Sequence, residues 1–122
     1  MKTLLLIEDD EINRQFLLEI LQEDYVVLTA ANGQQGLDIL EKEAQSISVI
    51  LLDIQMPVMN GYDAALAIRK MKDTKKSRIP IIAMTANVFA EDIQKVLSVG
   101  MNDHVAKPVD MNILVPTMMK YL

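Results

Sequence analysis

The chain has 122 residues, a formal net charge of −5, 51% hydrophobic residues and 24% charged residues. These values suit a single globular domain, residues 1–122, with one hydrophobic core. The absence of cysteine excludes disulfides, thiolate metal sites and cysteine nucleophiles, and the negative charge argues against non-specific binding to nucleic acid. No apolar run approaches the roughly 20 residues that cross a bilayer and no signal peptide is evident, so we expect a cytoplasmic protein.

Aliphatic runs predict strands at residues 3–7, 25–30, 48–52, 79–84 and 104–106. The third run consists almost entirely of branched aliphatic residues, which indicates a strand covered on both faces, as in a parallel sheet. Helical patterns separate the runs. The predicted fold is therefore α/β: a (βα)5 unit with a doubly wound, five-stranded parallel sheet of order 2-1-3-4-5, flavodoxin-like.

The first predicted helix covers residues 11–24, with Asp10 as its N-cap. Its apolar residues recur at helical spacing and are expected to face the core: Ile12, Phe16, Leu17, Ile20 and Leu21. Leu18 points away from this stripe and is a candidate for contact with a partner.

Four further helices are predicted from caps and apolar spacing. Asn32 caps the second, which turns Leu37, Leu40 and Ala44 to the core. Asn60-Gly61 opens the third; the fourth begins near Asn87 and stops at Gly100; the last covers residues 110–121 and contains Pro116, so it should be kinked or begin late.

Six of the 12 basic residues lie within residues 69–78. No aromatic residues interleave with them, so we interpret the cluster as a solvated helix end and loop and assign it no function.

Acidic residues follow two of the predicted strands. Glu8, Asp9 and Asp10 come after the first strand, and Asp53 comes directly after the third. If these strands are neighbours, the carboxylates converge, and each like-charged pair at roughly 4 Å costs about 4 kcal/mol at an effective dielectric near 20. Such a cluster indicates a bound cation or a protonated acid. Oxygen ligands without histidine or cysteine favour Mg²⁺ or a similar ion for Glu8 and Asp9, whereas Asp10 is better explained as the cap of the helix.

Two more polar side chains follow the remaining strands: Thr85 after the fourth and Lys107 after the fifth. Each alone is a common turn or surface residue. Together with the acids they form a set suited to phosphoryl transfer onto a carboxylate. Asp53 would attack, while the cation, hydroxyl and ammonium stabilise the phosphoryl oxygens.

The sequence resembles response-regulator receiver domains. Four motifs carry the resemblance: residues 8–14, residues 52–57 followed by Asn60-Gly61, residues 82–86, and Lys107-Pro108. With residues 100–104 ahead of the last motif, the chain is most similar to receivers of hybrid sensor histidine kinases.

The resemblance implies a role for each matching residue. Asp53 would be the phosphoacceptor, and Thr85 and Lys107 would bind the phosphoryl oxygens. Mg²⁺, or Mn²⁺ in its place, would be held by Asp53, by Asp9 directly, by Glu8 through water and by the backbone carbonyl of Gln55. A cis peptide bond between Lys107 and Pro108 is also implied.

The same resemblance implies the partners. The phosphoryl group would come from a phosphohistidine on a histidine kinase or histidine phosphotransfer domain, which docks over the strand-end loops and the first helix. No direct contact with nucleic acid or a membrane is expected, and the domain would be a monomer or a weak phosphorylation-dependent dimer. It would be cytoplasmic, either free-standing or the cytosolic part of a larger membrane-bound sensor kinase. It would not be an enzyme beyond its own aspartyl phosphorylation and slow dephosphorylation.

Two positions depart from the family pattern. Asp10 stands where asparagine is common, and His104 stands where tyrosine or phenylalanine usually acts as a mobile switch. His104 is interpreted either as a switch residue or as an ordinary strand-end residue.

Two alternative functions are compatible with parts of the pattern. One is an unphosphorylated pseudo-receiver that acts as a binding module, which the complete set of acids, hydroxyl and lysine disfavours. The other is a small phosphohydrolase with an aspartyl nucleophile, which would need a second carboxylate near Asp53 where the chain has Gln55.

Overall fold

The computed structural model describes residues 1–43, 47–56, 59–86 and 89–122. Within these ranges the strands are β1 (Thr3–Ile7), β2 (Val26–Ala30), β3 (Ile47–Asp53), β4 (Ile81–Thr85) and β5 (Asp103–Ala106). The helices are α1 (Glu11–Leu21), α2 (Gly33–Glu43), α3 (Gly61–Arg69), α4 (Thr74–Ser77), α5 (Ala90–Ser98) and α6 (Met111–Met119).

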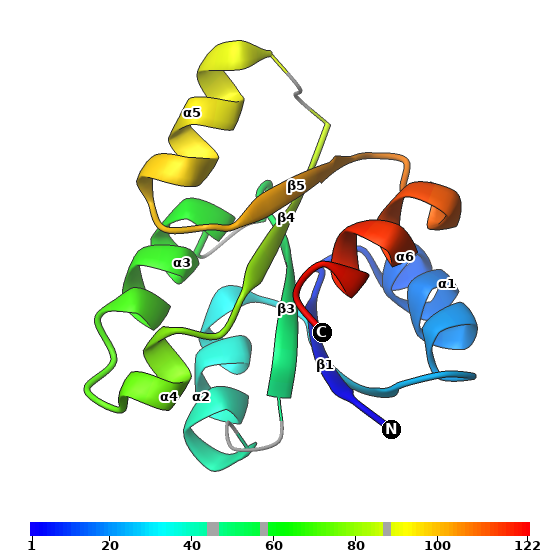
Figure 1. The fold of residues 1–122 in the computed structure, drawn as a ribbon, viewed down its shortest axis with the longest axis horizontal. Helices are drawn as coiled ribbons and strands as arrows, with labels where there is room; N and C mark the ends of the chain where they lie inside the picture. The colour runs from blue at the N-terminus through cyan, green and yellow to red at the C-terminus, as the bar shows by residue number, and fades with distance from the viewer. Residues whose placement is uncertain (44–46, 57–58, 87–88) are drawn as a thin grey trace.

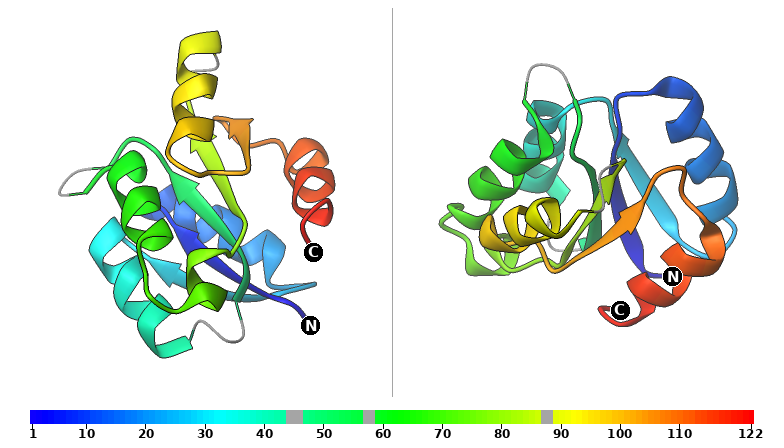
Figure 2. Two further views of the ribbon diagram at one scale, coloured as in Figure 1. Left: turned by 60° about the vertical axis from the view of Figure 1, so that its left-hand side comes forward. Right: turned by 90° about the horizontal axis from the view of Figure 1, so that it is seen from above.

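The strands form one parallel sheet in the order β2-β1-β3-β4-β5, which confirms the predicted topology. Helices α1 and α6 cover one face, and α2, α3 and α5 cover the other (Figures 1 and 2). In the sheet, β2 lies on one side of β1 and β3 lies on the other. The gap between β1 and β3 is therefore the switch point where α/β sheets commonly place their sites.

Two hydrophobic clusters, one on each face, hold the helices to the sheet. Alternate residues of β1 point to opposite faces, so Leu4 and Leu6 pack with α1 and α6, while Leu5 and Ile7 pack with α2, α3 and α5. β1 is fully buried and β3 nearly so, because they are interior strands covered on both faces. This double burial is the physical reason for their aliphatic runs.

Helix α1 departs from its predicted packing. Leu17 and Leu21 are buried, but Ile12 and Phe16 are 81% and 52% exposed, and Ile20 is also exposed. Leu17 and Leu21 alone form a buried line that packs against the core. Ile12, Phe16 and Ile20 form a neighbouring line with the same four-residue spacing, which is exposed. Leu18, predicted to point outward, is half-buried.

Some predicted element boundaries differ from the observed ones. The predicted range of the last helix is confirmed, because Asp110 caps the first turn of α6 by accepting from Asn112 N. Of the two effects predicted for Pro116, the late start is wrong and the kink stays a prediction, and Pro116 lies inside the helix on its exposed side. The short α4, capped by Asp73, was not predicted. β4 begins at Ile81 because Pro80 has no N–H for a strand ladder. The predictions for Ala44 and Asn87 lie outside the described residues.

The predicted stop of the fourth helical pattern is confirmed. Helix α5 ends at Ser98, and Gly100 follows with φ of +92°, a left-handed conformation that favours glycine. The turn directs the chain from α5 into β5.

Candidate functional site

The sheet register brings the predicted site residues to one edge. Ile7 of β1 pairs with Leu52 of β3, so the next residues, Glu8 and Asp53, are side by side. Asp53 in turn pairs with Met84 of β4, and Thr85 pairs with Ala106 of β5. Residues far apart in sequence therefore meet at the carboxyl end of the sheet, as predicted. The part of this end that carries Glu8, Asp9 and Asp53 is called the acidic edge.

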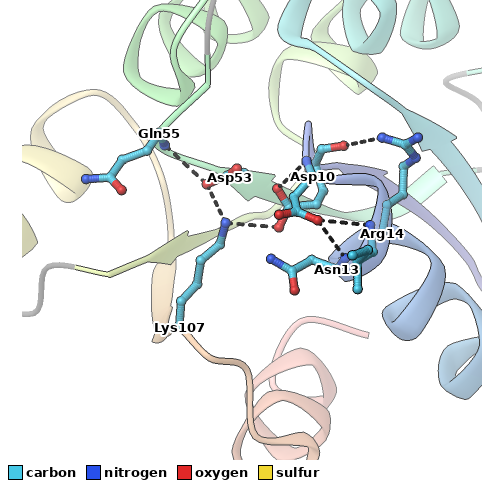
Figure 3. A network of polar contacts seen from close by, with 8 residues as sticks. Asp10, Asn13, Arg14, Asp53, Gln55 and Lys107 are labelled. Carbon is cyan, nitrogen blue, oxygen red and sulfur yellow. Dashed lines mark hydrogen bonds and ion pairs between the residues drawn. The ribbon is translucent and has the colours of Figure 1, made fainter.

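Lys107 bridges the two buried acids. Its Nζ lies 2.9 Å from Glu8 Oε1 and 2.9 Å from Asp53 Oδ1 (Figure 3). The peptide bond that follows, between Lys107 and Pro108, is cis, the geometry implied by the family resemblance. One ammonium thus neutralises part of the charge of two carboxylates.

Burial makes Asp53 a weaker acid than an exposed aspartate. Asp53 is 1% exposed and Glu8 is fully buried. Desolvation, followed by the interaction with the adjacent carboxyl of Glu8, raises the pKa of Asp53 from 3.8 to about 8, although Lys107 opposes the shift. Burial alone would lower the pKa of Lys107, but the contacts with Asp53 and Glu8 raise it above its ordinary value. The site has more negative than positive charge.

The donor set fits a hard divalent cation. Carboxylate oxygens of Glu8, Asp9 and Asp53 lie within 4.8 Å of one another. Asp53 Oδ2 is buried and has no hydrogen-bond partner within the described ranges, so it is available as a ligand or nucleophile. Oxygen donors at this spacing suit Mg²⁺. Gln55 lies beside them and donates its backbone N–H to Asp53 Oδ1 at 3.1 Å.

Asp10 does not join this cluster. Its Oδ1 accepts hydrogen bonds from Ile12 N at 2.9 Å and Asn13 N at 3.1 Å, so it caps α1 (Figure 3). The capping interpretation of Asp10 is confirmed. The extra carboxylate at this position faces the helix N-terminus, where the helix dipole favours it.

The backbone of Asp53 contacts the start of α3. A Cβ added at Gly61 would lie 2.5 Å from Asp53 O and 2.7 Å from Ile54 Cα. Asn60 caps the same helix by accepting from Asp63 N at 2.9 Å. The Asn60-Gly61 pair therefore allows α3 to begin directly against the strand end that carries Asp53.

Thr85 and His104 differ in their placement. Thr85 is buried at the end of β4, one residue beyond the partner of Asp53. His104 pairs with Ala83 further back along the sheet, and its Nδ1 lies 4.0 Å from Asp103 Oδ1. Thr85 lies at the acidic edge, and His104 is outside it. The switch role of His104 stays a prediction.

A cavity of about 420 Å³ adjoins the acidic edge. Glu8 and Lys107 lie at its polar end, and its walls are mostly apolar: Phe16, Leu17, Ala86, Pro108 and Val109, with Asn13. It separates α1 from the loop that follows β5. Phe16, which was expected in the core, instead borders this cavity.

Arg14, which lies within the motif of residues 8–14 but had no predicted role, also contacts the site. Arg14 Nη1 donates to Glu8 O at 2.8 Å (Figure 3). A single arginine on a helix has no partner that sequence spacing reveals. The nearest indication was its position one turn beyond the predicted cap, Asp10, where a long side chain reaches back to the strand end.

Comparison with known proteins agrees with this site. A model of the response regulator receiver domain matches residues 4–118. The chain belongs to the response regulator receiver domain family. Receiver domains act in two-component and phosphorelay signal transduction, as the sequence predicted.

Curated relatives confirm the predicted likeness to hybrid histidine kinases. This receiver domain is 36% identical over 130 residues to hybrid signal transduction histidine kinase B of Dictyostelium discoideum, covering 98% of the chain and 6% of that protein. It is 35% identical over 119 residues to sensor histidine kinase RcsC of Salmonella typhimurium, covering 97% of the chain and 12% of RcsC. The chain thus matches a small part of each relative.

Solved receivers share the fold over their whole length. Chemotaxis protein CheY4 of Vibrio cholerae superposes with a TM-score of 0.91 at 30% identity, covering 100% of this chain and 99% of CheY4. The receiver of sensor histidine kinase PA1611 from Pseudomonas aeruginosa, with magnesium coordinated in its active-site cleft, gives 0.87 at 33% identity, covering 98% and 96%. The Saccharomyces cerevisiae Ssk1 receiver, in complex with the phosphotransfer protein Ypd1, gives 0.89 at 28% identity, covering 98% and 88%.

No helix among the described residues is long and apolar enough to span a membrane.

Proposed function

We propose that this receiver domain accepts a phosphoryl group on Asp53 from a phosphohistidine of a histidine kinase or histidine phosphotransfer domain. One observation carries the proposal: Asp53 Oδ2 is buried and unpaired while Lys107 holds the other oxygen of the same carboxylate at 2.9 Å. A carboxylate oriented in this way presents one oxygen for attack. It also places a cation beside the charge that the phosphoryl group brings.

The transfer exchanges one bond to phosphorus for another. An oxygen of Asp53 attacks the phosphorus, the bond from phosphorus to the imidazole nitrogen breaks, and the electron pair remains on the imidazole. The product is an acyl phosphate on Asp53. Lys107 and the hydroxyl of Thr85 donate to the phosphoryl oxygens, which offsets the roughly −1.5 to −2 charges that phosphorylation adds.

The same residues would hold Mg²⁺, which Mn²⁺ could replace. Asp9 and Asp53 would bind it directly, Glu8 through water, and Gln55 through its backbone carbonyl. When bound, the ion supplies positive charge that favours ionised Asp53 and the incoming phosphoryl oxygens. The clustered carboxylates and the magnesium-bound receiver of PA1611 support this assignment.

The exposed line of α1 would form the docking surface for the phosphohistidine partner. Ile12, Phe16 and Ile20 lie on one side of the helix, and Phe16 reaches the cavity beside Glu8 and Lys107. Exposed apolar residues grouped next to a reactive centre favour a protein partner over a free metabolite. The complex of the Ssk1 receiver with Ypd1 is a precedent for such a partner.

The domain would store a phosphoryl group rather than turn over a substrate. A phosphohydrolase needs an acid near the nucleophile to protonate the leaving group, and the chain has the amide of Gln55 two residues beyond Asp53. A pseudo-receiver without phosphorylation would not need Asp53, Thr85 and Lys107 together. We place the domain in the cytoplasm, as part of a signalling chain that contains or meets a histidine kinase.

Phosphorylation can be tested with a small phosphodonor. The protein is incubated with acetyl phosphate, with and without Mg²⁺, and weighed by mass spectrometry. We expect a gain of one phosphoryl group that requires Mg²⁺, vanishes in Asp53→Asn and persists in Asp63→Asn, which alters an exposed aspartate of α3. No gain under any condition would instead support a binding module.

A further inference from the structure

Arg14 is fixed on the backbone of the metal-site loop, a contact that phosphoryl transfer itself does not use. Its guanidinium donates from Nη1 to the carbonyl oxygen of Glu8 at 2.8 Å, in a partly buried position. Glu8 is the residue that follows β1, and Arg14 is on the second turn of α1. The hydrogen bond therefore joins the end of the strand to the helix across the loop that carries the acids.

The Glu8 carbonyl shares a planar peptide unit with the amide nitrogen of Asp9. Holding that oxygen fixes the plane from which Asp9 projects. Asp10 N also donates to Glu8 Oε2 at 3.3 Å, and Asp10 Oδ1 accepts from Ile12 N at 2.9 Å. The loop between β1 and α1 is thus held at its carbonyl, at its side chain and at the helix cap.

We propose that Arg14 is a positioning residue for the divalent cation. It sets the direction of the Asp9 carboxylate toward Asp53 by locking the Glu8 carbonyl. The inference rests on the proposed function, because it presumes a cation held by Glu8, Asp9 and Asp53. Groups that orient metal ligands typically change metal affinity 10- to 100-fold when removed.

Charge and positioning predict opposite results for the loss of Arg14. A guanidinium near the site repels a divalent cation, so removing its charge alone would tighten binding. Releasing the Glu8 carbonyl would leave Asp9 with more orientations to lose on binding, so affinity would fall. The direction of the change therefore distinguishes the two roles.

The test is calorimetric titration of Mg²⁺ into the whole domain at fixed ionic strength. We expect Arg14→Ala to raise the dissociation constant about 10- to 100-fold. Arg14→Lys, which keeps the charge and a donor, should recover part of that loss. Arg78→Ala is the matched control: it removes an exposed arginine that precedes β4, at the opposite end of the sheet, and should change affinity less than about twofold.

Binding by Arg14→Ala that equals or exceeds wild type would overturn the inference. Wild type that binds no Mg²⁺ would instead contradict the proposed function. If circular dichroism shows Arg14→Ala unfolded, Arg14→Met decides, since it removes the charge and the N–H donor but keeps a long side chain. Weaker binding by Arg14→Met than by Arg14→Lys and by wild type supports positioning. Binding by Arg14→Met that equals or exceeds wild type refutes it.

Discussion

Asp53 is buried in surroundings that oppose its ionisation. Its pKa of about 8 results mainly from desolvation, with Glu8 adding to the shift. Lys107 contacts both acids but cannot neutralise both. The arrangement has a functional logic, because a site with excess negative charge gains most when a cation binds.

The shift of Asp53 predicts how stability depends on pH. In the metal-free protein the folded state holds one proton more than the unfolded state between pH 3.8 and about 8. The free energy of unfolding should therefore fall as pH rises through that window, by up to about 1.4 kcal/mol per pH unit, and level off above it. Urea unfolding from pH 5 to 9 with a chelator present measures the slope.

The Asp53→Asn variant has no ionisable group at this position, so its free energy of unfolding should lack the fall with pH that Asp53 causes. The free energy of unfolding of the variant should exceed that of wild type most at high pH. Asp63→Asn, at an exposed position, should keep the wild-type slope. Parallel pH profiles for wild type and Asp53→Asn would show that Asp53 has an ordinary pKa.

At the scale of elements, α1 contacts two environments along neighbouring lines. Leu17 and Leu21 secure it to the sheet, while Ile12 and Phe16 remain exposed beside the acidic edge. Because Leu17 and Leu21 supply the packing of α1 against the sheet, the exposed line is available for contact with a partner. The opposite edge of the same helix supplies Arg14 to the loop.

Phe16→Ala should impair transfer from a protein donor and spare transfer from a small one. With a phosphorylated phosphotransfer protein such as Ypd1 as donor, we expect KM to rise about tenfold, since an aromatic residue near an interface centre commonly contributes more than 1 kcal/mol. The rate with acetyl phosphate should be unchanged. Radiolabel transfer measured over a range of donor concentrations gives both values.

Leu97→Ala, on the exposed side of α5, is the matched control and should leave KM for the protein donor unchanged. If Phe16→Ala slowed both donors equally, its effect would lie in the site and not in docking.

At the scale of the whole molecule, Arg69 links segments at the end of the sheet opposite Asp53. It donates to Gly100 O, Ser77 O, Ile79 O and Asn102 Oδ1 at 2.7 to 2.9 Å. Its half-buried guanidinium, whose pKa is lowered by desolvation, thereby joins α3 to the starts of β4 and β5. This network explains why one member of the basic cluster is not simply solvated.

Arg69→Met should lower the free energy of unfolding by about 2–4 kcal/mol, because it leaves four acceptors without their cationic donor. Lys70→Met, which alters the exposed neighbour, should change it by less than about 0.5 kcal/mol. Urea denaturation of both variants measures the difference. Equal stabilities would mean that water replaces the lost hydrogen bonds without cost.

The sheet and the acidic edge were predictable because they follow from regular features of parallel strands. Interior parallel strands need aliphatic residues on both faces, and parallel register brings the residues that follow β1 and β3 together. Asp53 and Glu8 were therefore identified from position alone. Residue types then indicated the chemistry of the edge.

The remaining features depend on tertiary neighbours. The two apolar lines of α1 have the same spacing, so only the packing of the sheet and α6 decides which is buried. Helix α4 has no apolar face, and a capping Asp73 is its one local signal. Arg14 and Arg69 bond to backbone carbonyls, which every residue has, so no sequence pattern marks their partners.

The site combines residues that follow the first and the last strand of the chain. Glu8 follows the first strand, and Lys107 follows the last. A chain truncated before β5 would lack Lys107 and would leave the carboxylates of Glu8 and Asp53 side by side without their shared ammonium. Under the proposed function, such a truncated receiver should not be phosphorylated on Asp53, so the site depends on the last strand as much as on the first.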